Sequence, residues 1–144
     1  MNTALFRSRM LPMLLLATAA AHAAWLLAQH ADRDTAFQLQ VLALMAPLVR
    51  SGQAAAKDYA YLWDRTHDPQ RYGTQGTCVA PGAWQPFEVD DIAALDERRR
   101  AVGVEPELDY IARFKTLCTQ ADSSGMPGEP FYGRRTVRIG KPPG

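Results

Sequence analysis

Apolar and polar residues follow each other with the period of a helix over most of this chain. Between positions 35 and 50 the large apolar residues recur every three or four positions, which places them on one face of a helix. The residues of this stripe are Phe37, Val41, Leu44 and Leu48. Asp32 or Asp34 can cap the start of the helix, and Ser51-Gly52 supplies its end.

A second helix is expected over positions 54–66, ending before Pro69, because proline disfavours the α conformation in the residue before it. Its expected inward residues are Tyr59, Leu62, Trp63 and Thr66. From 71 to 89 the pattern changes to glycines and prolines with β-favouring residues between them. This stretch predicts a short hairpin or two irregular strands.

Two more helices are expected after the hairpin. Asp90 or Asp91 can cap the first and Gly103 can stop it, and Pro106 suits the first turn of the second. The inward residues expected for the two helices are Ile92, Leu95 and Val102, and then Tyr110, Ile111, Phe114, Leu117 and Cys118. The predicted fold class is therefore mainly α: a small helical domain of about four helices, with a short β-hairpin inserted between the second and third.

The expected domain organisation is one globular domain over 24–118. From 119 to 144 the composition shifts to glycine, proline and serine, which predicts a mostly flexible tail. Within this tail, alternating residues over 131–139 leave open a strand that docks on the hairpin.

The N-terminus is typical of a secretory signal peptide. Arg7 and Arg9 stand in a segment without acids, Leu11 begins an unbroken apolar run, and an Ala-His-Ala site ends at Ala23. Cleavage after Ala23 would place the protein in the periplasm or outside the cell. Two alternatives are an uncleaved membrane anchor and a core helix over 11–29 in a cytoplasmic chain.

The net charge of the chain does not indicate a particular class of partner. The chain has 16 Lys and Arg against 15 Asp and Glu, a net charge of +1, so the strongly basic field of a nucleic-acid-binding protein is missing. The Arg98-Arg99-Arg100 run predicts a solvated helix face. We expect no nucleic-acid partner, and membrane contact only through the leader.

The two cysteines leave two interpretations open. Cys78 and Cys118 both follow the leader, so they could form a disulfide in an oxidising compartment, or remain two buried thiols. Their spacing matches neither a metal site nor a redox pair.

Candidate chemistry is concentrated in three short polar runs: Gln-His-Ala-Asp at 29–32, Asp-Arg at 64–65, and Gln-Arg-Tyr-Gly-Thr-Gln at 70–75. The candidate catalytic residues are His30 as an acid or base, with Asp32 or Asp64 to orient it. The candidate binding residues are Arg65, Arg71, Tyr72, Thr74 and Gln75. If 71–75 is extended, Arg71 and Gln75 share one face, and Tyr72 and Thr74 the other.

Each candidate residue also has a structural interpretation. His30 could continue the apolar stripe into the core, unless the helix breaks near Asp32. Asp32 or Asp34 could serve only as a cap, and Asp64 or Arg65 could form a salt bridge across the fold. No known catalytic motif or metal-ligand spacing is present in the sequence. We therefore expect neither a metal nor a cofactor.

Four segments in this order resemble a known family. They are Ala-Trp-Leu-Leu-Ala-Gln-His-Ala-Asp at 24–32, Tyr-Leu-Trp-Asp-Arg at 61–65, Gln-Arg-Tyr-Gly-Thr-Gln at 70–75 and Asp-Glu-Arg-Arg-Arg-Ala-Val-Gly at 96–103. Together they are similar to the bacterial domain of unknown function family numbered 6624, over roughly 24–114. The resemblance implies that His30, Asp32, Asp64, Arg65, Arg71, Tyr72 and Gln75 lie together, and it implies no reaction. Members usually have a further helical segment and a Gly-Trp-Pro-like turn upstream, where this chain has a leader-like segment. The resemblance leaves two options open: an exported, shortened member, or a cytoplasmic member whose start has been lost and whose residues 11–20 only mimic a leader.

Two functions from different classes follow from the sequence. One is a protein-binding or structural module, such as an inhibitor or immunity-type partner, in which the polar residues form a buried hydrogen-bond network. The alternative is a polar pocket that binds or hydrolyses a small anionic molecule, held by Arg71 and Gln75. The partner is accordingly another protein or a small anionic ligand, and the sequence leaves the oligomeric state open.

Overall fold

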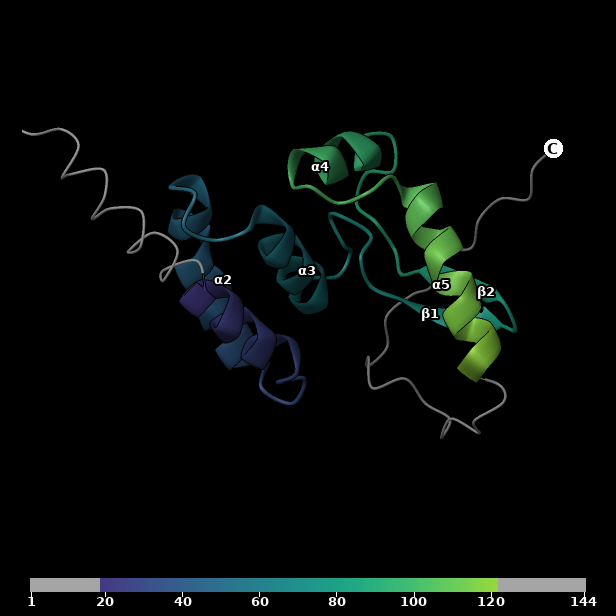
Figure 1. Ribbon diagram of the computed structural model, residues 1–144, viewed down its shortest axis with the longest axis horizontal. Coiled ribbons are helices and arrows are strands. Elements are labelled where there is room, and N and C mark those ends of the chain that lie inside the picture. Colours follow the sequence, from purple (N-terminus) through teal and green to yellow (C-terminus); the bar gives the residue numbers. More distant parts are fainter. Residues whose placement is uncertain (1–18, 122–144) are drawn as a thin grey trace, which may run out of the picture. The chain divides into compact units, whose positions relative to one another are not determined.

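The computed structural model describes residues 19–121, and it confirms the mainly helical fold class with its short hairpin (Figure 1). A helical segment over 19–29 comes first, followed by helices α2 (Thr35–Arg50) and α3 (Ala56–Thr66). Strands β1 (Gly76–Ala80) and β2 (Ala83–Pro86) form the hairpin. Helices α4 (Leu95–Ala101) and α5 (Glu107–Ala121) follow it. The chain divides into two compact units between Leu62 and Trp63.

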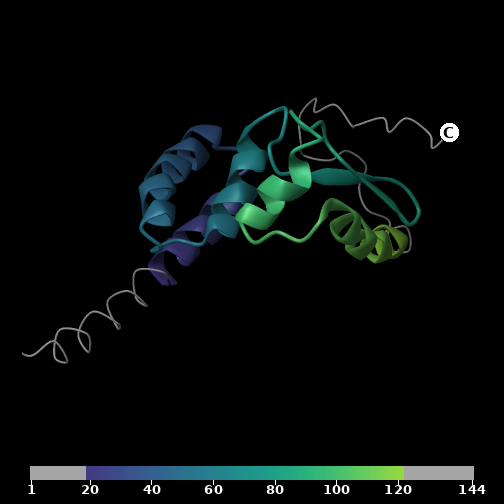
Figure 2. The same ribbon diagram turned by 90° about the horizontal axis from the view of Figure 1, so that it is seen from above.

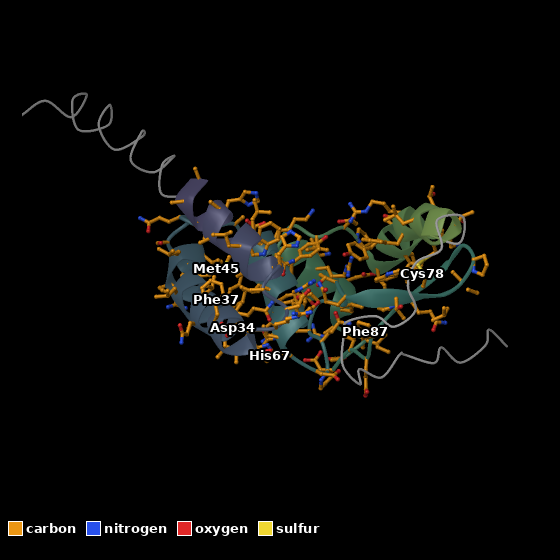
Figure 3. All side chains as sticks on the ribbon, turned by 90° about the horizontal axis from the view of Figure 1, so that it is seen from below. Asp34, Phe37, Met45, His67, Cys78 and Phe87 are labelled. Atoms are coloured by element: carbon orange, nitrogen blue, oxygen red, sulfur yellow. A yellow bond between two sulfur atoms is a disulfide. The ribbon has the colours of Figure 1, made fainter. Side chains whose placement is uncertain are left out.

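In the first unit, the segment 19–29 and α2 form an antiparallel pair joined by the turn 30–34 (Figures 1 and 2). Asp34, at the start of α2 (Figure 3), accepts a hydrogen bond of 2.8 Å from the Phe37 N–H. Of the two predicted caps, Asp32 and Asp34, the helix therefore uses Asp34. The buried amide of Gln38 donates to the Ala28 carbonyl oxygen over 2.9 Å and links the two helices.

The predicted inward face of α2 is wrong by about one residue position. The buried side chains are Gln38, Val41, Leu42 and Met45. Phe37 is 38% exposed and Leu44 is 69% exposed, although both were expected inside. Val41 is buried as predicted, and the polar Gln38 joins the buried face with a hydrogen bond to the Ala28 carbonyl oxygen, a contact that a hydropathy pattern does not contain.

Helix α3 crosses the boundary between the two units and begins later than the expected start at Ala54. Leu62 is fully buried as predicted, whereas the other expected inward residues, Tyr59, Trp63 and Thr66, are half-buried. The helix ends at Thr66, and the His67 ring (Figure 3) stacks on the Trp63 ring with centroids 3.9 Å apart. The chain therefore leaves the helix before Pro69, as the sequence predicts.

The hairpin of the second unit is antiparallel, with Cys78 opposite Trp84 and Gly76 opposite Pro86. Gly82 turns the chain with a φ of 66°, a conformation that glycine adopts without strain. Gly76 has no room for a side chain, because a Cβ there would overlap the Gln85 carbonyl oxygen and the Trp84 ring. Close packing of β1 against β2 therefore depends on glycine at position 76.

Helix α4 starts later than its aspartate signals suggest. Asp91 accepts hydrogen bonds from the N–H groups of Ala93 and Ala94, which precede Leu95, the first helical residue. Leu95 is buried as expected, but Ile92 is 55% exposed and its predicted inward position is wrong. Ile92 lies in the turn before the helix, so helical spacing does not govern its direction.

Helix α5 lies against the hairpin in both views (Figures 1 and 2). The Trp84 ring of β2 meets the rings of Tyr110 and Phe114, at centroid distances of 5.6 and 5.0 Å. A disulfide between Cys78 of β1 and Cys118 of α5 joins the other strand of the hairpin to the same helix, which decides between the bridge and the two free thiols. The expectation for Leu117 is wrong, because this residue of the predicted stripe is 52% exposed.

Three expectations fall wholly or largely outside the described residues. The leader lies there except for residues 19–23, which belong to the first helical segment. The flexible tail lies there except for its first residues, since α5 continues to Ala121, and the possible strand over 131–139 lies there entirely. Between residues 19 and 121, no helix is both long enough and apolar enough to cross a membrane.

Candidate functional site

The second and third polar runs meet around the carboxylate of Asp64. Its Oδ1 accepts hydrogen bonds from the N–H groups of Arg71 and Tyr72, at 2.9 and 3.0 Å. Its Oδ2 accepts from both the N–H and the hydroxyl group of Thr74, at 2.8 and 2.9 Å. Asp64 is fully buried near the end of α3. The loop 70–75 is therefore wrapped around one carboxylate.

The environment of Asp64 acts on its pKa in two opposing directions. Burial raises the pKa of the carboxyl above its usual value, because removal from water disfavours the charged form. The hydrogen bonds from Thr74, Tyr72 and Arg71 lower the pKa, and burial is the larger effect. A raised pKa in a buried acid is found at catalytic sites and in structural networks alike. The surroundings of the carboxylate must therefore decide its role.

The side chain of Gln70 closes the same loop from the opposite end. Its amide nitrogen donates to the carbonyl oxygens of Gln75 and Phe87, at 2.9 and 3.1 Å. Its amide oxygen accepts from the Gln75 N–H over 2.7 Å. The Gln70 backbone also bonds to Glu88 and Asp90, so the loop is held to the segment that follows β2. Gln70 is fully buried and serves as a hydrogen-bonding clamp.

Arg99 of α4 supplies a buried cation to this loop. Its guanidinium donates through Nη1 to the carbonyl oxygens of Tyr72 and Gly73, and through Nε to that of Glu105. The guanidinium carbon lies 4.6 Å from the centroid of the Tyr110 ring, and the Tyr110 hydroxyl donates to the Thr74 carbonyl oxygen over 2.9 Å. Burial lowers the pKa of Arg99 below its usual value.

Gly73 allows the loop to turn between the amide groups that bind Asp64. Its φ of 61° lies in the left-handed region, which most residues adopt only with strain. A Cβ there would lie 3.4 Å from the nearest side-chain atom of Val89, an ordinary contact distance. The glycine is therefore needed for its backbone conformation more than for space.

The structure corrects two expectations about these residues. The segment 71–75 is an irregular loop, so the predicted strand alternation is wrong: Tyr72, Thr74 and Gln75 are all buried, and only Arg71 is exposed. The amides of this loop converge on Asp64 instead of pairing with a strand. The predicted solvated face of α4 is also wrong for Arg99, which is fully buried because backbone carbonyl oxygens solvate its charge.

The remaining candidates lie as follows. Arg65 donates to the side-chain oxygen of Gln75 over 3.1 Å, and the Gln75 amide donates to the Thr74 hydroxyl over 3.2 Å. This chain of hydrogen bonds ends at Asp64.

His30 and Asp32 are exposed in the turn after the first helical segment, so His30 is not a core histidine. Both belong to the first unit, whereas Asp64 belongs to the second. The predicted catalytic grouping of the three stays a prediction.

Three residues of the network were missing from the predicted site: Gln70, Arg99 and Tyr110. Gln70 is the first residue of the hexapeptide run. Arg99 follows Leu95 by four positions on α4, and this spacing places Leu95 and Arg99 together on the inward face of the helix. That helical spacing was the signal that could have identified Arg99. Within 19–121, no cluster of His, Cys, Asp or Glu has the composition to hold a metal ion.

Comparisons with known proteins add no relative. The chain matches no family model, no curated protein and no solved structure. The resemblance to the family numbered 6624 accordingly stays a prediction.

Proposed function

We propose that this chain is a protein-binding module in which the polar network around Asp64 is a scaffold and not a catalytic centre. The main support for this proposal is that both oxygens of the Asp64 carboxylate already accept hydrogen bonds from within the protein. Each oxygen of Asp64 accepts two hydrogen bonds from the loop 71–74. A general base must present a lone pair to its substrate, and the donors of this loop occupy that position.

The same argument disfavours the hydrolytic alternative at the other candidate residues. The polar side chains of Thr74 and Gln75 are buried and bonded to neighbours within the network. Arg71, which was expected to hold an anion, contributes its N–H group to Asp64 and exposes its side chain. The polar groups of Thr74 and Gln75 are therefore used within the network, and the Arg71 side chain is turned to the surface.

A protein partner is favoured by the apolar side chains on the surface of α2. Phe37 and Leu44 are separated by two helical turns, so they share one face. Both are exposed, at 38% and 69%, while the adjacent face of the helix forms the core of the first unit. Exposed aromatic and leucine side chains on a common face are typical of protein contact surfaces.

The disulfide between Cys78 and Cys118 supports an extracytoplasmic location, in the periplasm or outside the cell. Disulfides persist in oxidising compartments and are rare in the cytoplasm. Removal of the leader after Ala23 is a separate question. The intact mass of the purified protein answers it.

Site-specific photo-crosslinking in the native bacterium tests the proposed binding function. A photoreactive residue at Leu44 should give one discrete adduct, and the same residue at exposed Gln40 serves as the control position on α2. Introducing Phe37→Ser should remove the Leu44 adduct without changing the melting temperature. An adduct that survives Phe37→Ser, or no adduct at Leu44, would contradict the binding surface.

A ligand titration tests the enzyme alternative separately. Phosphate and acetate should leave the melting temperature of the wild-type protein and of Arg71→Ala equally unchanged. A rise in melting temperature with either anion that Arg71→Ala abolishes would favour the anionic pocket over the scaffold.

A further inference from the structure

The first unit contains a histidine–aspartate pair that lies apart from the Asp64 network. His22 of the first helical segment contacts Asp58 of α3, with 2.7 Å between Nδ1 and Oδ2. One turn further along each helix, the rings of Trp25 and Tyr61 meet edge to face with centroids 6.5 Å apart. The two helices are thus joined at two successive levels, and in both the polar contact lies on the N-terminal side of the aromatic contact.

The orientation of the His22 ring is set by two contacts. The Asp58 carboxylate holds Nδ1, and the ring stacks on Trp25 with centroids 5.1 Å apart. A carboxylate bound to one imidazole nitrogen fixes the direction of the other. The His22 side chain is 54% exposed while that of Asp58 is 12% exposed, so the carboxylate anchors a ring whose far edge remains accessible.

An open hollow of about 420 Å³, exposed to solvent on one side, lies beside this pair. His22 and Asp58 line it together with four small residues: Ala19, Gly52, Ala54 and Ala55. Gly52 has a φ of 72° and no atom within 4 Å of the position a Cβ would take, so the wall recedes there. The hollow exists because the surrounding side chains end at Cβ or have none. Its volume lies in the range of small-molecule sites.

We propose that the cavity beside His22 and Asp58 binds a compact, largely apolar alcohol or phenol, whose hydroxyl group bonds to Nε2 of His22. Methyl groups and backbone supply most of the wall, which suits an apolar body. A hydroxyl group both donates and accepts, so it can pair with Nε2 whether or not that nitrogen carries a proton. No turnover is required, and the site is independent of the binding surface proposed above.

This inference requires His22 to be present in the mature protein. Cleavage after Ala23, which the leader pattern predicts, would remove both Ala19 and His22 from the site. The inference therefore applies to the uncleaved chain. The intact mass of the protein purified from its native host is the first measurement, and a chain that starts at Ala24 overturns the proposal.

Phenol and toluene are suitable probes, since they differ in the hydroxyl group. Long-range proton–nitrogen NMR spectra of the full-length protein report the imidazole nitrogens directly, and the variant His22→Phe assigns the His22 signals. Phenol should shift these signals saturably, while toluene should bind about fivefold more weakly, as expected for one lost hydrogen bond. Equal affinities for the two probes, or no saturable shift up to the solubility limit of phenol, would overturn the proposal.

Two further variants test the same site without changing His22, in case His22→Phe destabilises the protein. Ala55→Leu fills the cavity from an exposed position and leaves the His22–Asp58 contact in place, so it should abolish the phenol response. Ala43→Leu adds the same side chain at an exposed position of α2 and should leave the response unchanged. A phenol shift that persists in Ala55→Leu, or a His22 shift produced by Zn²⁺ and not by phenol, would reject the hydroxyl site.

Discussion

Thr74 donates two hydrogen bonds to one oxygen of Asp64, through its N–H group at 2.8 Å and its hydroxyl at 2.9 Å. The two residues are ten positions apart and both are buried. This pairing fixes the loop that joins α3 to the hairpin, because the loop can then adopt one position around the carboxylate. The stability of the second unit should consequently depend on polar side chains that a hydrophobic core would exclude.

Thr74→Val tests the hydroxyl bond. The valine side chain has nearly the same shape, but it leaves the Asp64 carboxylate with one donor fewer, so the free energy of unfolding should fall by about 1.5–3 kcal/mol. Urea denaturation of the purified variant measures it. Thr77→Val, at a half-buried position of strand β1, should change stability by less than about 0.5 kcal/mol. Equal losses in the two variants would show that the Thr74 hydroxyl contributes nothing specific.

Asp64→Asn tests the raised pKa of the carboxyl through the pH dependence of stability. The folded-state pKa lies above the unfolded value near 3.8, so the folded protein binds the Asp64 proton more tightly. The stability that this proton contributes is fully present below the unfolded pKa, and it is lost as the pH rises through the folded pKa.

The wild-type protein should therefore lose stability relative to Asp64→Asn, which cannot titrate, as the pH rises from about 4, and the difference should level off above the folded-state pKa. Urea titrations between about pH 4 and about pH 7 measure this difference. Asp68→Asn, at an exposed position, reports any general effect of the substitution. A gain in relative wild-type stability with rising pH would mean that the hydrogen bonds outweigh burial.

Arg99→Met should be far more destabilising than Arg100→Met. The first substitution leaves the carbonyl oxygens of Tyr72, Gly73 and Glu105 without their charged donor, which should cost at least about 3 kcal/mol. Arg100 is exposed, so its loss should cost less than about 0.5 kcal/mol. Thermal and urea unfolding measure both variants. Similar losses would restore the prediction that the whole arginine run is a solvated face.

Gly76→Ala should disrupt the hairpin, because a Cβ there overlaps both the Gln85 carbonyl oxygen and the Trp84 ring. Gly103→Ala introduces a residue at a φ of 73° in open space, and it should cost only about 1 kcal/mol. The difference between the two variants in urea denaturation isolates steric overlap from backbone strain. A smaller loss at position 76 than at 103 would contradict the close approach of the two strands.

Removal of the disulfide should lower the free energy of unfolding by about 2–4 kcal/mol, because the bridge between Cys78 and Cys118 closes a long loop in the unfolded chain. The double variant with serine at both positions, compared with the wild type with and without reductant, measures this loss. The reduced wild type and the double variant should melt at similar temperatures. Insensitivity of the wild-type melting temperature to reductant would argue against the bridge.

Element boundaries were largely predictable because local signals set them. Helix α2 has the predicted bounds, since Asp34 caps it and the Ser51-Gly52 pair ends it. The side that each helix buries was less predictable. On α2 the predicted stripe misses by about one position, because the buried face includes the polar Gln38, which is bonded to the Ala28 carbonyl oxygen. On α4 a charged residue, Arg99, occupies the buried face, and hydrophobicity alone assigns it to solvent.

The candidate site was predicted in part. The proximity of Asp64 to the run 70–75 was inferred, and Arg71, Tyr72 and Thr74 do contact it. The form of that contact was not inferred, because an extended strand was assumed. Backbone N–H groups are present at every residue except proline, so the sequence of side chains does not show which of them will bond to a carboxylate. The left-handed turn at Gly73 was the nearest local signal.

The sequence by itself determined the bounds of α2, the end of α3, the place of the hairpin, and the two cysteines available for a bridge, because capping residues, glycine and proline act on their immediate neighbours. Only the tertiary structure decided what the polar residues do. Asp64, Gln70 and Arg99 are buried, and each bonds to backbone groups from elsewhere in the chain: the Thr74 N–H, the Phe87 carbonyl oxygen and the Tyr72 carbonyl oxygen, respectively. Burial of a polar group depends on such partners, and their positions exist only once the chain has folded.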